Sequence, residues 1–290
     1  MTKGNLILCK GVCNAIMIVF PVLLLFLSVP LLTQTKRTLV IGIGKQKNES
    51  WTKINRDKDV SYVQQILLNA GYMDVRTLVN EQATKVAIVA AIKKLADKCK
   101  VGDIVYVQFS GHGRLVTDEN GDEADGWDEA WIPYDAYLKY GKKDKGEKHL
   151  IDDEINTLLT AIRNKIGDSG KLLVVVDACH SSDSSRGDDI DETVRGVKDE
   201  FIIPEKRRGT ARKAPEQWLT LSVCKDYQLN QEMKNHKAGK LTYALYFLSE
   251  KGSITIEAVQ LFMQRNRGRF AQIPLQTGET SKYKISDFIR

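Results

Sequence analysis

The chain has 290 residues, of which 42% are apolar and 28% are charged. This composition excludes low-complexity disorder as a description of the whole chain, and the length suits one large domain. The 43 Lys and Arg residues exceed the 37 Asp and Glu residues by only six, so no nucleic-acid partner is expected. Five cysteines are too few for a disulfide scaffold of this size.

An uncharged, strongly apolar segment lies near the N-terminus. Residues 11–35 carry no charge, and Lys3 and Lys10 precede them. This order is typical of a secretory signal peptide, but roughly 20 apolar residues can also span a bilayer. We therefore expect residues 1–35 to be a signal peptide or a membrane anchor. Residues 36–290 are then one domain that is exported (periplasmic or extracellular), or held at the membrane if the segment stays uncleaved.

Strand and helix patterns alternate along the rest of the chain. Apolar, β-branched runs predict strands at 38–44, 75–79, 103–109, 172–176 and 218–223, with a sixth at 273–276. Helical spacing predicts helices at 57–71, 81–99 (capped by Asn80), 151–166, 241–249 and 254–267. This alternation predicts an α/β fold with a mostly parallel six-stranded sheet and helices on both faces. Two long stretches, 113–149 and 181–216, lack strong periodicity and are expected to be loops.

Two predicted strands end in residues that carry chemistry. The third runs into SGHG at 110–113, and the fourth into DACHSS at 177–182. Ligands of open parallel sheets bind beyond the carboxyl ends of the strands, so His112 and Cys179 face each other if these strands are neighbours. An imidazole can hold a thiol as thiolate, and the glycines beside His112 leave the Gly113 N–H available to an oxyanion. The pattern predicts a catalytic Cys–His pair.

Each residue of this pair also has a plainer interpretation. Alone, Cys179 would be taken as an inert buried thiol and His112 as a hydrogen-bonded loop histidine. Their joint position after two strong strands favours the catalytic interpretation. A zinc site that adds His180 and Cys224 lacks the usual ligand spacing.

These motifs resemble those of the caspase-like cysteine peptidases, in particular those of the metacaspase branch. Further matching blocks are DGWDE at 125–129, DDE at 152–154, CKDYQ at 224–228 and GKLT at 239–242, whereas Ser182 stands where the family has Gly. The resemblance implies a caspase-like three-layer sandwich and cysteine endopeptidase activity on peptides or proteins. By the same resemblance, Cys179 is the nucleophile, His112 the general base and acid, and the N–H groups of Gly113 and Cys179 the oxyanion hole. The alternative is a catalytically silent module that binds peptides or partners.

Carboxylates near Cys179 and His112 predict which substrate residue lies directly before the cleaved peptide bond. Asp177 and Ser110 lie two positions before Cys179 and His112, so strand periodicity puts each on the face of its catalytic neighbour. Asp59 adds another carboxylate. A carboxylate in a partly desolvated pocket favours Arg or Lys and repels Asp, and metacaspases likewise cut after basic residues. The alternative is that Asp177 only accepts hydrogen bonds from neighbouring backbone N–H groups.

The stretch at 181–216 holds eight basic residues. In caspase-like enzymes it corresponds to the linker between the large and small parts of the domain, and exposed linkers are common sites of proteolytic nicking. We expect self-cleavage at 206–208 or 212–213, with fragments that stay associated through the fifth strand. A basic loop that is never cut is the alternative.

An acidic loop raises the question of a metal. Residues 118–129 contain seven acids in twelve positions, but Gly121 is misplaced for an EF-hand. Resemblance to calcium-activated metacaspases implies Asp152, Asp153 and Asp128 as ligands, with calcium as a possible activator and no required cofactor. A solvated acidic loop is the alternative.

Overall fold

The computed structural model describes residues 1, 34–55, 57–179, 195–197, 199–204, 215–224, 228, 230–268 and 271–290. Gln34–Arg290 pack together as one unit. Most of the expected signal or anchor segment and both expected self-cleavage clusters, 206–208 and 212–213, lie outside the described residues. Within the described ranges, no helix has the length and apolar character needed to cross a membrane.

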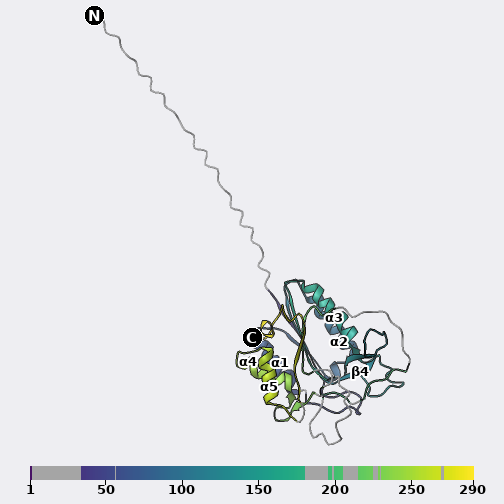
Figure 1. The fold of residues 1–290 in the computed structure, drawn as a ribbon. Coiled ribbons are helices and arrows are strands. Elements are labelled where there is room, and N and C mark those ends of the chain that lie inside the picture. The colour runs from purple at the N-terminus through teal and green to yellow at the C-terminus, as the bar shows by residue number, and fades with distance from the viewer. Residues whose placement is uncertain are drawn as a thin grey trace. The chain divides into compact units, whose positions relative to one another are not determined.

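A six-stranded, mostly parallel sheet organises the domain, as the alternating pattern predicts (Figure 1). Leu275–Gly278 (β11) runs antiparallel to its neighbour, and the other adjacent pairs are parallel. The predicted sixth strand therefore exists, two residues later than expected. In spatial order the strands are β11, β8 (Leu219–Ser222), β7 (Lys171–Asp177), β3 (Ile104–Ser110), β1 (Lys36–Gly42) and β2 (Val75–Val79).

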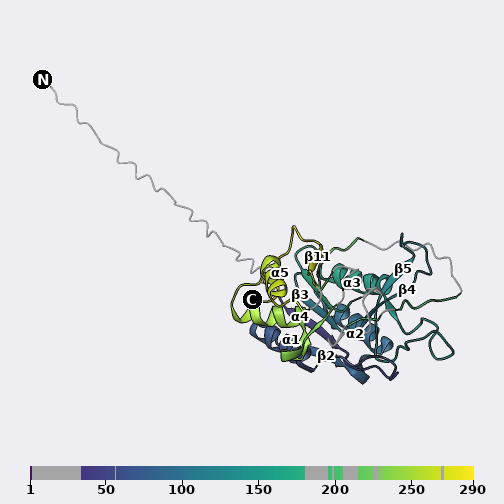
Figure 2. The same ribbon diagram turned by 60° about the horizontal axis from the view of Figure 1, so that its bottom comes forward.

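Helices cover both faces of this sheet (Figures 1 and 2). One face carries α2 (Lys85–Lys98) and α3 (Asp152–Ile166), and the other carries α1 (Asp57–Asn69), α4 (Lys240–Glu250) and α5 (Ile256–Arg265). Successive strand side chains point to opposite faces, so each strand contributes residues to the hydrophobic cores on both sides of the sheet. In β1, Leu39 and Ile41 join the core under α2 and α3, whereas Val40 joins the core under α1 and α4. The expected three-layer sandwich is confirmed.

The expectation of a loop over 113–149 is wrong. This stretch contributes to a three-stranded antiparallel sheet of β4 (Gly113–Thr117), β5 (Trp127–Trp131) and β6 (Leu150–Ile151). The alternating pattern is weak because β4 buries polar groups: Arg114 is 4% exposed and donates to the carbonyls of Leu138, Asp199 and Glu200. A charged residue in a buried strand hides the period that identifies strands.

The predicted start of the second helix is also wrong. Helix α2 begins at Lys85, because the Thr84 hydroxyl accepts a hydrogen bond from the Ala87 N–H and caps it. Asn80 instead adopts a positive φ of 44°, and its side chain accepts from the Gly44 N–H after β1. Asn80 thus ties the 3₁₀ turn Asn80–Gln82, which follows β2, to the loop after β1. A second hairpin, β9 (Glu232–Met233) with β10 (Ala238–Gly239), precedes α4.

Candidate active site

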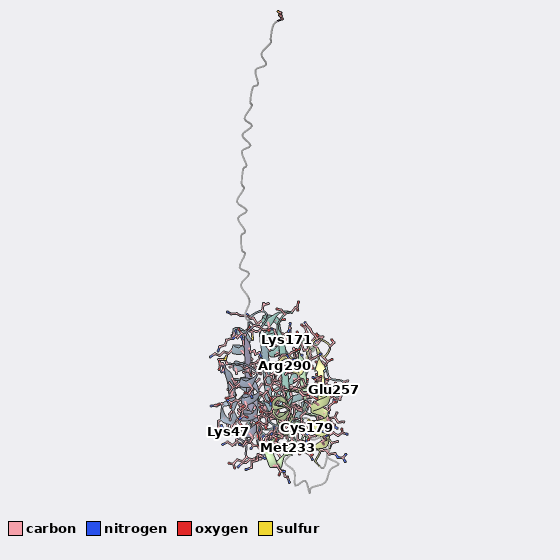
Figure 3. The ribbon with its side chains drawn as sticks, turned by 90° about the vertical axis from the view of Figure 1, so that its left-hand side faces the viewer. Lys47, Lys171, Cys179, Met233, Glu257 and Arg290 are labelled. Carbon is pink, nitrogen blue, oxygen red and sulfur yellow. The ribbon has the colours of Figure 1, made fainter. Side chains whose placement is uncertain are left out.

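The ends of β3 and β7 bring His112 and Cys179 to one edge of the sheet. The two strands are parallel neighbours, and Ser110 pairs with Asp177 in register. His112 and Cys179 therefore each lie two residues beyond the same rung. Figure 3 shows Cys179 at the opposite end of the domain from Lys171, the first residue of β7. The sequence analysis has His112 and Cys179 face each other only if β3 and β7 are neighbours, and the two strands are neighbours.

The His112 ring is buried and held by one backbone group. Its Nε2 lies 2.7 Å from the carbonyl oxygen of Thr52, so Nε2 carries the proton and donates. Nδ1 is then the basic nitrogen, and it has no hydrogen-bond partner among the described residues. Burial lowers the His112 pKa to about 4, with a further lowering by the charge of Arg195, although the Thr52 bond raises it. The imidazole is therefore neutral at pH 7 and can accept a proton at Nδ1.

The Cys179 thiol is also buried, with 1% of the residue exposed. Its sulfhydryl donates to the carbonyl oxygen of Gln228 at 2.6 Å, and the Cys224 sulfhydryl donates to the same oxygen at 3.3 Å. Neither residue forms a disulfide, and nor does Cys99, which is buried at the end of α2. The Cys179 backbone N–H donates to the carbonyl oxygen of Arg195 at 2.9 Å.

Gly113 begins β4, directly after His112. The Ile132 N–H donates to the His112 carbonyl, so Gly113 and Trp131 form the next, non-hydrogen-bonded pair of the β4–β5 ladder. The Gly113 N–H consequently points away from β5. It remains available for the oxyanion role implied by the family resemblance.

A pocket of carboxylates lies beside Cys179 and encloses the guanidinium of Arg195, which is fully buried. Arg195 Nη1 donates to Asp59 Oδ2 at 2.5 Å and lies 3.7 Å from Asp177 Oδ1. Its Nε and Nη2 lie 3.2 and 3.0 Å from Glu232 Oε1. Nη2 also donates to the Asn55 carbonyl at 2.8 Å. All three guanidinium nitrogens thus have an acceptor.

Burial and charge act against each other in this pocket. Burial, helped by the charge of Asp177, raises the pKa of Asp59 to about 7, although Arg195 and the Gly239 N–H lower it. The carboxylates of Asp59, Asp177 and Glu232 together hold the pKa of Arg195 above its usual range, despite its burial. The charge of Arg195 therefore opposes the rise that burial causes in the pKa of Asp59.

The other two expected pocket residues have structural partners. Asp177 accepts from the Thr242 N–H at 3.0 Å, the Thr242 hydroxyl at 2.6 Å and Asn230 Nδ2 at 2.9 Å. It therefore anchors the start of α4, and its Oδ1 also lies 3.7 Å from Arg195 Nη1. The Ser110 hydroxyl accepts from Gln108 Nε2 and is 1% exposed.

The sequence of this domain matches a known family. Residues 36–185 match the family model described as metacaspase, peptidase C14 domain. The chain belongs to the metacaspase family.

Individual relatives agree with this assignment. Metacaspase-2 of Arabidopsis thaliana is 32% identical over 154 residues, which are 50% of this chain and 34% of the relative. Metacaspase-1A of Aspergillus oryzae is 26% identical over 247 residues, which are 81% of this chain and 49% of the relative. This metacaspase chain thus spans about a third to a half of the length of these curated relatives.

A solved structure has the same fold. The crystal structure of protein GSU0716 from Geobacter sulfurreducens superposes with a TM-score of 0.63, over 88% of this chain and 97% of that one. The two sequences are 22% identical, so this likeness concerns the fold alone.

The acidic loop of this metacaspase is only partly solvated. Asp128 on β5 is 2% exposed, and its Oδ1 has no hydrogen-bond partner among the described residues. Carboxylate oxygens of Asp118, Asp122 and Asp128 all lie within 4.8 Å of one another. Burial raises the pKa of Asp128 to about 8, with further contributions from Asp152, Asp118, Asp153 and Asp122. Of the three expected acids, Asp128 alone belongs to this group of close oxygens, whereas Asp152 and Asp153 act on it through their charge. Asp118 and Asp122 are additional acids that the sequence analysis did not select.

Sequence reasoning missed two residues of the carboxylate pocket of this metacaspase. Glu232 lies in an irregular segment between the matching blocks at 224–228 and 239–242, where no periodicity marks it. Arg195 is one of eight basic residues in a stretch expected to be loop. Its burial among acids is what singles it out.

Proposed function

We propose that this chain is a cysteine endopeptidase that cleaves peptide bonds after arginine or lysine. One observation carries the proposal: a single residue, Arg195, places its guanidinium in the carboxylate pocket and its carbonyl oxygen on the Cys179 N–H. In a chain bound as Arg195 is, the residue whose side chain fills the pocket is therefore also the residue whose carbonyl lies at Cys179. This is the spacing that cleavage directly after a basic residue requires.

The residues present can carry out each step of thiol catalysis. His112 Nδ1 takes the proton of the Cys179 thiol, and the sulfur attacks the carbonyl carbon of the substrate. The Cys179 N–H, and the Gly113 N–H by family resemblance, stabilise the oxyanion. Protonated His112 then gives its proton to the leaving amine, and water hydrolyses the thioester. The thiol must first leave the Gln228 carbonyl, to which it donates in the resting state.

The charge of the pocket supports a basic specificity. Asp59, Asp177 and Glu232 are all buried, so their field is poorly screened by water. An aspartate side chain would add a fourth negative charge without any cation to balance it, and it would be repelled. Arginine and lysine are attracted.

This proposal is tested with peptides that differ only at the residue before the cut. We expect kcat/KM for arginine to exceed that for aspartate by at least about 10³-fold, because a site built for a hydrogen-bonded cation rejects a side chain that lacks it. Peptides with lysine should be cleaved, but less rapidly than those with arginine. Preferential cleavage after aspartate would refute the specificity. Absence of labelling by a thiol-directed peptide electrophile, with and without calcium, would instead support the catalytically silent module.

The proposal includes self-processing within 181–216 and export or membrane attachment through residues 1–35. Arg195 supports the first, because it belongs to that stretch and occupies the pocket. The basic N-terminus followed by the uncharged run at 11–35 supports the second.

We also propose that Ca²⁺ binds at the acidic loop and stabilises the domain. The buried Oδ1 of Asp128 supports this, since it has no hydrogen-bond partner in the described part of the chain and Asp118 and Asp122 offer oxygens close to it. Asp152 and Asp153, at the start of α3, add negative charge that a divalent cation would neutralise. The cation would order the loop beside β5 and takes no part in bond cleavage.

Calorimetric titration of the Cys179→Ala protein with CaCl₂ tests this site. We expect Asp128→Asn to weaken Ca²⁺ binding by at least about tenfold, because it removes the buried charged ligand. Glu119→Gln, a change of the same charge in the same loop, should have a much smaller effect. Equal affinity in all three proteins, or no binding heat in any of them, would contradict the proposal.

A further inference from the structure

A second thiol lies beside the proposed nucleophile. The sulfhydryl groups of Cys179 and Cys224 both donate to the carbonyl oxygen of Gln228, at 2.6 and 3.3 Å. Because they share one acceptor atom, the two sulfurs cannot lie farther apart than these two hydrogen bonds placed end to end. The proposed mechanism gives Cys224 no task, so its place next to the nucleophile has a different origin.

The sheet brings the backbones of the two residues close enough for a disulfide. Strands β7 and β8 are parallel neighbours, with Val176 opposite Ser222, and the Val223 N–H donates to the Val176 carbonyl just beyond that pair. Cys179 and Cys224 follow this pair by three and two residues. Neighbouring strands lie about 4.8 Å apart, and the Cα atoms of disulfide-bonded residues usually lie about 4.4–6.8 Å apart. A bond between the two sulfurs therefore needs rotation of side chains and little movement of the backbone.

A cavity gives small molecules access to both cysteines. It has a volume of about 420 Å³, and both Cys179 and Cys224 line it, together with residues of α3, β8 and β11. The two cysteines are only 1% and 8% exposed, so a small oxidant can reach them and the thiol of another protein cannot. Cys99 does not line this cavity. Burial raises the pKa of the Cys99 thiol to about 12, and a thiol reacts as its thiolate, so Cys99 is inert.

We infer that Cys179 and Cys224 form a reversible disulfide when a hydroperoxide enters this cavity, and that the bond switches the nucleophile off. The loss of activity rests on the proposed function, whereas the bond itself does not. Without a second thiol nearby, an oxidised nucleophile goes on to the irreversible sulfinic acid. Cys224 thus protects Cys179.

The oxidation proceeds in two balanced steps. The Cys179 sulfur attacks one oxygen of the hydroperoxide and the O–O bond breaks, which gives a sulfenic acid and releases an alcohol, or water from hydrogen peroxide. The Cys179 thiol proton passes through His112 to the leaving oxygen. The Cys224 sulfur then bonds to the Cys179 sulfur as the S–OH bond breaks, and the Cys224 proton leaves with that hydroxyl as water. Two thiols are oxidised and one hydroperoxide is reduced. A dithiol reductant restores both thiols.

Peptide mapping in the absence of reductant tests for the bond. Full-length wild type treated with an equimolar amount of hydrogen peroxide should give a peptide that joins Cys179 to Cys224 and that separates with dithiothreitol. A count of thiols is not sufficient, because the chain also contains Cys9 and Cys13. Cys99→Ala, the matched control, should form the same bond at the wild-type rate. Sulfinic acid at Cys179 without the joined peptide overturns the inference, and so does a bond from Cys179 to any other cysteine.

Activity on an arginine peptide tests the consequence of the bond. Peroxide should lower the wild-type rate by at least about tenfold, and dithiothreitol should restore nearly all of it. Cys224→Ser keeps a donor for the Gln228 carbonyl, so its activity before oxidation should equal that of wild type. After peroxide, the fraction of activity that dithiothreitol restores should be at least about tenfold smaller in Cys224→Ser than in wild type, because its Cys179 oxidises further.

Equal recovery in wild type and Cys224→Ser overturns the inference and leaves the proposed function standing. If reduced wild type does not cleave the arginine peptide, the proposed function fails. The peptide map then decides by itself whether the two cysteines form the bond.

Discussion

Replacement of Cys179 by alanine is expected to lower kcat/KM for an arginine peptide by at least about 10⁴-fold, because no other group can form the thioester. His112→Ala should cost nearly as much, since the proposed mechanism needs its unprotonated Nδ1 to take the thiol proton. The double variant should be little worse than either single one, because residues that act as a unit are not additive. The rates are best measured in an Arg195→Ala background, where the pocket is open from the start.

Cys99→Ala is the matched control for this experiment. Cys99 is a buried thiol like Cys179, but it ends α2, away from the carboxyl ends of β3 and β7. Its variant should keep most of the activity. A Cys179→Ala protein that keeps more than about 1% of the parent rate would contradict the proposed Cys179–His112 pair, because loss of the nucleophile should lower the rate much further.

Removal of a pocket carboxylate is expected to cause the second large effect. Glu232 Oε1 accepts from both Nε and Nη2 of Arg195, whereas lysine has a single nitrogen to offer. Glu232→Gln should therefore lower kcat/KM for arginine peptides by about 10²-fold and for lysine peptides by less. Asp59→Asn should lower kcat/KM for both arginine and lysine peptides, because Asp59 accepts a hydrogen bond from the outer nitrogen Nη1 of Arg195.

The control for charge is Asp287→Asn. Asp287 pairs with Lys171 at the other end of the sheet, so its loss leaves the pocket intact. Kinetics with matched arginine and lysine peptides give the measurement. An unchanged ratio of arginine to lysine cleavage in Glu232→Gln would show that Glu232 does not select the guanidinium.

The parts of the fold that the sequence predicts are those with uninterrupted patterns. Strands β3 and β7 are continuous apolar runs, and His112 and Cys179 directly follow them, so the positions of both residues could be derived before any coordinates. Their parallel pairing supplied the missing fact, that the two strands are neighbours.

Other parts depend on long-range contacts that no local pattern reports. Strand β4 buries Arg114, which finds its acceptors 24 to 86 residues away. Glu232 joins the pocket through Arg195, 37 residues earlier in the chain. A spacing rule cannot find such residues, because their role is fixed by what the tertiary structure places opposite them.

The pKa of Asp59 links occupancy of the pocket to protons. With a guanidinium present, burial holds this pKa at about 7, and the guanidinium itself lowers it. When the cation leaves, the pKa rises further, so the emptied pocket takes up a proton that a filled pocket releases. Protons and basic side chains therefore compete for the same carboxylate. As the pH rises above about 7, Arg195 and basic substrates alike are held more tightly, and acidification loosens both.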